Sequence, residues 1–97
     1  MVIVAGHITV DPSRRESYLA GGVRILEIAR AAQGCLDISF GADLIDPSRI
    51  NLFERWESRE ALDTFRTSGG ASDEQPDARL AVSVEEYDIA EVRPLFG

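Results

Sequence analysis

The sequence predicts an α+β fold of the ferredoxin-like type, in which two helices cover one face of a four-stranded antiparallel sheet. Segments rich in Val and Ile that alternate in polarity indicate strands, and two segments with an apolar stripe at helical spacing indicate helices. These segments follow one another in the order β-α-β-β-α-β. The length of 97 residues is close to that of one domain, so we expect a single domain over residues 1–97.

The first strand and the start of the first helix are predicted from residues 2–10 and the residues that follow them. Residues 2–10 are rich in Val and Ile, and Asp11-Pro12 ends the strand because proline lacks the backbone donor that a strand needs. Two helix starts compete: Asp11 as N-cap with Pro12 in the first turn, or Ser13 as N-cap within a capping box. Either start predicts a helix of about 20 residues that ends at Gly34.

The first helix has a broad apolar face, which is typical of a helix that lies across a sheet. The stripe consists of Leu19, Val23, Leu26 and Arg30, flanked by Gly22, Ile25, Ala29 and Ala32. Each glycine of the pair Gly21-Gly22 costs about 1 kcal/mol relative to alanine in a helix. The pair is therefore either a weak point or a place where the helix approaches its neighbour closely.

A hairpin is predicted after the first helix. Residues 35–45 alternate, with Leu36, Ile38, Phe40, Ala42 and Leu44 on one face. A turn at Asp46-Pro47-Ser48 separates them from a third strand at residues 50–57.

The last third of the chain is predicted to contain one helix, one loop and one strand. Ser58 can cap a second helix that runs to about Ser68. Residues 68–77 have the composition of a loop, and its length is typical of a lid or a disordered segment. Residues 82–92 are expected to form the last strand.

The charge and composition exclude several classes of protein. Seventeen acidic residues oppose ten basic ones, which gives a net charge of −7, so we expect no nucleic-acid partner. The chain contains no lysine, which excludes Schiff-base chemistry and an amine base. No apolar run approaches the roughly 18 residues that span a bilayer, and no signal peptide is apparent. We therefore expect no membrane partner and a cytoplasmic protein.

The first strand is apolar on both sides, which predicts a partner for the second face of the sheet. Val2, Val4 and Ile8 alternate with Ile3 and Ala5. Two helices can cover only one face, so a second subunit is expected to cover the other. The sequence therefore predicts a homodimer.

Two motifs resemble those of the antibiotic biosynthesis monooxygenase-like proteins. Residues 32–36, Ala-Gln-Gly-Cys-Leu, are similar to the Glu-Pro-Gly-Cys junction between the first helix and second strand of that family. Residues 53–62, Phe-Glu-Arg-Trp-Glu-Ser-Arg-Glu-Ala-Leu, resemble its Glu-x-Trp strand followed by a Glu-Ala-Leu helix start. Together with the element order, the resemblance covers about residues 1–68.

The resemblance implies a dimeric α/β barrel with a pocket between sheet and helices in each subunit. Members include oxygenases that oxidise polycyclic phenols such as anthrones without metal, flavin or haem, as well as haem-degrading enzymes and isomerases. Phe65 stands where the family often has a histidine, and this chain has no histidine besides His7. Haem-degrading members resemble one another in a tryptophan at that position, a histidine further along and an asparagine in strand one, where this chain has Phe65, no second histidine and Gly6-His7, so haem degradation is disfavoured. The family fixes the fold better than the reaction.

Five side chains are candidates for a substrate site. His7 is either the base that deprotonates a phenol or a hydrogen-bonded residue on the dimer face of the sheet. Trp56 is either a core anchor or a pocket wall, and Phe65 is a second candidate wall. Glu54 shares a face with Trp56 and is either a general acid or base with a raised pKa or the partner of an arginine. Tyr87 is a candidate hydrogen-bond donor.

From the sequence and the resemblance we predict a cofactor-free monooxygenase that binds a small aromatic or polyketide-like molecule. The deprotonated substrate would react directly with oxygen, and the protein would supply desolvation and orientation. The alternative is a non-oxidative member of the same fold, either an isomerase or a small-molecule binding or stress-response module. One histidine and one cysteine, Cys35, make a protein-built transition-metal site improbable.

Overall fold

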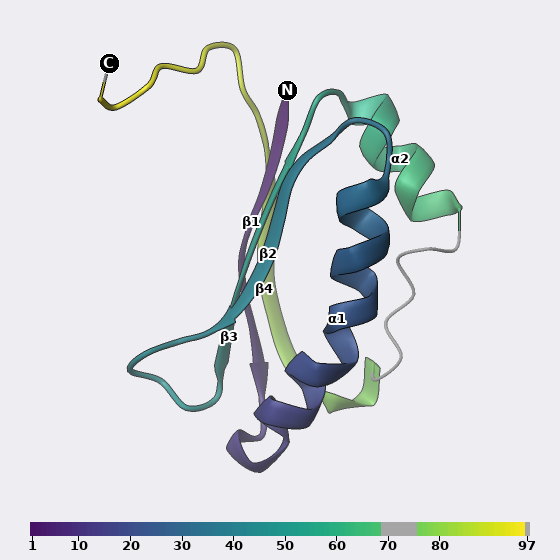
Figure 1. The fold of residues 1–97 in the computed structure, drawn as a ribbon. Coiled ribbons are helices and arrows are strands. Elements are labelled where there is room, and N and C mark those ends of the chain that lie inside the picture. The colour runs from purple at the N-terminus through teal and green to yellow at the C-terminus, as the bar shows by residue number, and fades with distance from the viewer. Residues whose placement is uncertain (69–75, 97) are drawn as a thin grey trace.

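The computed structural model describes residues 1–68 and 76–96 of the chain. One antiparallel sheet with the strand order β2-β3-β1-β4 carries both helices, α1 and α2, on the same face (Figure 1). This is the ferredoxin-like arrangement, and the predicted fold is confirmed. The strands are β1 (Val2–Val10), β2 (Cys35–Ala42), β3 (Arg49–Trp56) and β4 (Arg79–Asp88), the helices are α1 (Arg15–Ala31) and α2 (Arg59–Thr67), and short 3₁₀ turns occupy Pro12–Arg14 and Pro76–Ala78.

The start of α1 differs from the prediction. Asp11 accepts a hydrogen bond from the backbone N–H of Ser13 at 2.9 Å, but the turn that it caps is the 3₁₀ turn, and α1 begins at Arg15. At its other end α1 stops at Ala31, and the predicted end residue, Gly34, lies three residues further along. Its φ of +86° favours glycine, and a Cβ at this position would overlap the Cβ of Ala61.

The glycine pair of α1 lies where the helix approaches the sheet. Gly22 is buried, and a Cβ added there would lie 3.1 Å from the ring of Phe40 on β2. Ala29 is buried beside it, and Leu26 packs against the same core. Val23, in contrast, is 51% exposed, so this part of the predicted stripe is wrong.

Arg30, the last residue of the predicted stripe, contacts the outer edge of the sheet. Its Nε and Nη2 donate to the carbonyl of Ile38 on β2 at 3.1 and 2.9 Å. Because β2 is an edge strand, no neighbouring strand on its outer side can donate a backbone hydrogen bond to this carbonyl. The arginine thus satisfies and covers an edge that could otherwise pair with another chain.

The alternation predicted for residues 35–45 holds only in part. The pairing of β2 with β3 shifts between Cys35 and Asp37, so Leu36 leaves the predicted face and is 44% exposed. The strand ends at Ala42, and Leu44 is fully exposed in the turn that follows, together with Ile45. Ile38 and Phe40 keep the predicted inward direction.

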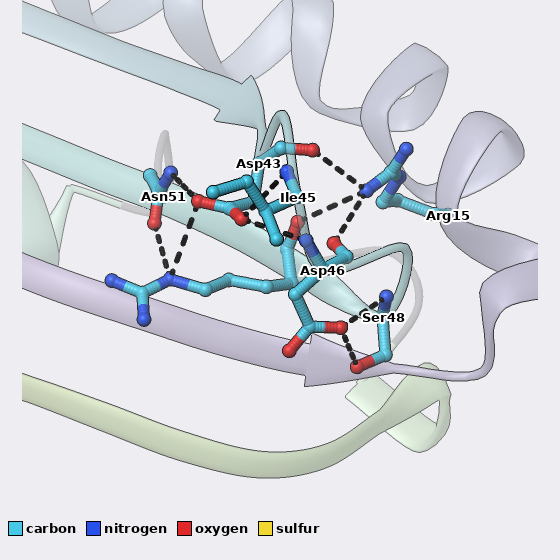
Figure 2. A network of polar contacts seen from close by, with 7 residues as sticks. Arg15, Asp43, Ile45, Asp46, Ser48 and Asn51 are labelled. Carbon is cyan, nitrogen blue, oxygen red and sulfur yellow. Dashed lines mark hydrogen bonds and ion pairs between the residues drawn. The ribbon is translucent and has the colours of Figure 1, made fainter.

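Hydrogen bonds hold the turn between β2 and β3 in one conformation (Figure 2). The carboxylate of Asp43 accepts from the backbone N–H groups of Ile45 and Asp46 at 3.1 and 2.9 Å. Arg15 of α1 donates through Nη1 to the carbonyls of Asp43 and Asp46 at 3.3 and 2.9 Å. The first turn of α1 is thereby tied to the hairpin.

The last strand is shifted toward the N-terminus relative to the prediction: it covers Arg79–Asp88 and not 82–92. Most of the predicted loop, residues 69–75 of 68–77, lies outside the described residues. Within the described part of the chain, no helix is long and apolar enough to cross a membrane.

Candidate functional site

The strand register divides the five predicted site residues between the two faces of the sheet. Val2 and Val4 of β1 are buried under the helices, and their partners on β3 are Trp56 and Glu54. Paired residues point to the same face of a sheet, so both candidates lie on the helix side. Phe65 of α2 packs against Trp56 from above, with ring centroids 5.1 Å apart and planes tilted by 34°.

His7 and Tyr87 lie on the other face, which no helix covers. His7 is an odd-numbered position of β1 and pairs with Asn51 on β3 and Ser83 on β4. Tyr87 pairs with Ile3 of β1 and is 46% exposed. Within one subunit the structure therefore brings Glu54, Trp56 and Phe65 together, and it does not bring the two remaining candidates to them.

Trp56 is both a core residue and a hydrogen-bond donor. Its side chain is fully buried, at 0% exposure, among Val2, Ile38 and Leu62. Its indole Nε1 donates to Oε1 of Glu54 at 2.9 Å. The indole therefore satisfies its own polar atom and fixes one oxygen of the carboxylate.

Burial raises the pKa of Glu54 above its ordinary value. The hydrogen bond from Trp56 and the positive charge of Arg66 act in the opposite direction, and the negative charge of Glu86 adds to the rise. Among the described residues Glu54 forms no ion pair. A half-buried carboxylate that is more basic than usual is suited to accept a proton from a bound molecule.

The ion pairs between α2 and β4 lie beside this site and were not predicted from the sequence. Arg66 pairs with Glu86 at 3.0 Å, and Arg59 contacts Glu86 at 3.4 Å and Asp88 at 3.0 Å. Two arginines seven positions apart share a face of a helix, and two acidic residues two apart share a face of a strand. That spacing was visible in the sequence, but only the fold shows that the two faces meet.

The open face of the sheet combines apolar residues with charges. Ile3, Ala5 and Phe53 are half-buried there. The Nε atom of Arg55, on the same face, is buried and has no hydrogen-bond partner among the described residues. Buried polar groups in folded proteins nearly always have a hydrogen-bond partner, so this donor can bind a partner that lies outside the described residues.

Cys35 and the acidic residues show no arrangement that is typical of a metal site. In residues 1–68 and 76–96 no three His, Cys, Asp or Glu side chains are grouped to hold a metal ion. Burial and the negative charge of Glu54 raise the pKa of the Cys35 thiol. A thiol with a raised pKa is a poor nucleophile at neutral pH, so Cys35 is read as structural.

The fold is that of a small ferredoxin-like protein with a half-buried carboxylate on the helix side of its sheet. Comparison with known families identifies the family. The sequence profile described as antibiotic biosynthesis monooxygenase matches residues 1–78. The chain belongs to the antibiotic biosynthesis monooxygenase family.

Solved structures share this fold, and one curated relative is similar in sequence to part of the chain. A Deinococcus radiodurans structure that carries the family's name has a TM-score of 0.87 at 22% identity, over 100% of both chains. Another, from Nitrosomonas europaea, has a TM-score of 0.84 at 15% identity, over 94% of this chain and 100% of that one. Rv0793 from Mycobacterium tuberculosis has a TM-score of 0.74 at 25% identity, over 97% of both chains.

The relative is the uncharacterized protein sll1783 from Synechocystis sp., which is 36% identical over 62 residues. The match covers 64% of this chain and 42% of that protein.

Proposed function

We propose that this protein is a cofactor-independent monooxygenase that acts on a small aromatic or polyketide-like molecule bound on the helix side of the sheet, in the cytoplasm. The observation that carries the proposal is the carboxyl of Glu54, half-buried in an apolar layer and held by Trp56. Membership of the family supports the reaction class.

Glu54 acts as the base in the proposed reaction. Its carboxylate takes a proton from a phenol or from the carbon beside a carbonyl, and the substrate becomes an electron-rich anion. That anion transfers electrons to molecular oxygen, so that a CH₂ group and O₂ become a carbonyl group and water. The protein contributes desolvation, orientation and the proton acceptor, while the substrate is itself the reductant.

His7 is the base of a competing hypothesis. It lies on the open face, so it would act on a molecule bound there and not beside Glu54. Tyr87 shares this face and would be the hydrogen-bond donor of such a site. Trp56 and Phe65, in contrast, support the site at Glu54, as the buried wall behind the carboxyl.

A non-oxidative function is the second candidate, and the same carboxyl favours it. A half-buried glutamate can move a proton between two carbons of a bound molecule without oxygen, as an isomerase does. A small-molecule binding module would need the wall of Trp56 and Phe65 but not the basicity of Glu54.

We also propose that a second copy of this chain covers the open face. The face is apolar at Ile3 and Phe53 and carries both signs of charge: Arg55 of β3 lies opposite Asp37 of β2, and Glu85 of β4 lies opposite Ala5 of β1. Such a surface can complement itself about a two-fold axis. The β2–β3 turn and the C-terminal segment both project beyond the sheet on the side away from the helices (Figure 1). They carry exposed side chains, namely Leu44, Ile45, Leu95 and Phe96.

Oxygen uptake by metal-stripped protein tests the reaction, with a panel of anthrones and hydroquinones as substrates. We expect uptake that saturates with substrate and falls about 100-fold or more in Glu54→Gln, while His7→Ala retains it. The reverse pattern would place the base on the open face. Binding of panel members without uptake would favour the non-oxidative function.

A further inference from the structure

The region around Glu54 is bordered by an ion pair that no step of the proposed reaction uses. Val4 of β1 pairs with Glu54 on one side and with Glu86 on the other, so both carboxylates lie on the helix side with one strand between them. Arg66 reaches from α2 to Glu86, with Nη1 3.0 Å from Oε1. The pair therefore spans from α2 to β4 beside the strand that separates the two carboxylates.

We infer that the Arg66–Glu86 ion pair is a positioning device for Glu54, which tunes how readily the half-buried carboxylate accepts a proton. The inference rests on the proposed function of Glu54 as the base. Arg66 and Glu86 do not contact the reacting atoms in this account. They act on the charge of Glu54 from two neighbouring elements.

The charges around Glu54 can be assigned element by element. Helix α2 contributes the positive charge of Arg66, and β4 contributes the negative charge of Glu86. Strand β1 contributes only the uncharged Val4 at this level, and β2 contributes the uncharged Ile38 opposite Glu54 and the thiol of Cys35 opposite Trp56. Burial has the largest effect on the pKa of Glu54, and the ion pair adds two full charges, of which Arg66 lowers this pKa and Glu86 raises it.

The second half of the α2–β4 contact provides a matched control. Arg59 of α2 bonds Asp88 at 3.0 Å, two residues along β4 from Glu86, and contacts Glu86 itself at 3.4 Å. Asp88 is exposed and does not contribute to the pKa of Glu54. Removing this carboxylate loosens the same pair of elements and keeps Arg66 and Glu86, the two charges that act on Glu54, in place.

The experiment is an NMR titration of the side-chain carboxyl carbon of Glu54 in ¹³C-labelled protein, with Glu54→Gln used for assignment. We expect the midpoint to move upward in Arg66→Gln, because a stabilising positive charge is lost. We expect it to move downward in Glu86→Gln, because a repelling negative charge is lost and Arg66 is released. Arg66→Lys keeps the charge and should stay near the wild-type midpoint, as should Asp88→Asn.

A merely structural role for the pair predicts a different result. Loosening α2 from β4 would move the midpoint in the same direction in both variants, and Asp88→Asn would follow them. Any pattern other than opposite shifts in Arg66→Gln and Glu86→Gln would overturn the inference. The titration needs no turnover, so a failure to take up oxygen would contradict the proposed function and leave this test intact.

Discussion

The indole Nε1 of Trp56 donates a hydrogen bond to Oε1 of Glu54 at 2.9 Å, although both side chains belong to the same strand. Residues two apart on a strand stand about 6.6 Å from each other along the chain, so the bond requires the two side chains to lean toward each other along β3. The side chain that anchors the core is therefore also the one that orients the candidate base.

Trp56→Phe is expected to lower the stability of the folded protein and to raise the pKa of Glu54. The variant leaves Oε1 of Glu54 without its donor in a half-buried position, which should lower the free energy of unfolding by roughly 1–3 kcal/mol. Loss of the bond should also raise the pKa of Glu54 further, since the bond lowers it in the wild type. Urea denaturation measures the first effect and a carboxyl titration the second. Unchanged values in both would show that the bond contributes nothing in solution.

Glu54→Gln is expected to stabilise the folded protein at neutral pH while it abolishes the proposed activity. The folded pKa of Glu54 lies above its unfolded value of 4.5, so the folded state binds more protons between these two values. Stability is therefore lost as the pH rises through this window, because an ionised carboxylate must stay half-buried. The glutamine side chain does not titrate, so the stability of the variant relative to the wild type should increase as the pH rises. Urea midpoints at pH 4 and pH 7 test this, and a gain that is equal at both pH values would contradict it.

Most of the fold follows from patterns within single elements, whereas the site depends on pairing between elements. The Ser58 cap of α2 depends on local backbone chemistry and was predicted correctly, whereas α1 ends at Ala31, three residues before the predicted Gly34. Leu36 was misplaced because a bulge shifts the face of every residue before it, and alternation alone carries no sign of a bulge.

The face that His7 occupies could not be predicted either, since both faces of β1 are apolar. Its side was fixed only by the register with β3 and β4. The contact of Arg66 with Glu86 joins residues twenty positions apart. The sequence contains many arginines and glutamates, and their residue types alone do not predict which of them pair.

Gly6→Ala is expected to disrupt the pairing of β1 with β4. Gly6 has a φ of +154°, and a Cβ there would overlap the carbonyl oxygen of Ser83 and lie 2.7 Å from Cα of Val84. These are backbone atoms, so the strain cannot be relieved by a side-chain rotation, and we expect a loss of at least about 3 kcal/mol. Gly41→Ala is the matched control on β2, because nothing lies within 4 Å of its Cβ. Equal stabilities of the two variants by urea denaturation would contradict the close approach.

Asp43→Asn is expected to reduce the sensitivity of the protein to acid. Hydrogen bonds from the backbone N–H groups of Asp46 and Ile45 and from the side chain of Asn51 lower the pKa of Asp43 from 3.8 to about 2. A lowered pKa contributes stability that is present above the unfolded value and is lost as the pH falls from about 4 to about 2. The advantage of the wild type over the variant should shrink across this window. Thermal unfolding at several pH values tests this, with exposed Asp63→Asn as a control for the general loss of a negative charge.

Phe53→Arg is expected to convert a dimer into a monomer, if a second copy covers the open face. Phe53 lies in the middle of that face, paired with Ala5 of β1 and Ser39 of β2. In a dimer with a two-fold axis, each subunit would place the new positive charge in an apolar contact. The two arginines would also lie close to each other. Val82→Arg is the matched control, because Val82 is an exposed valine on the helix side of β4. Sedimentation equilibrium should give twice the chain mass of 10.6 kDa for the wild type and the control, and the single mass for Phe53→Arg. A wild-type protein that sediments as a single chain would refute the proposed dimer.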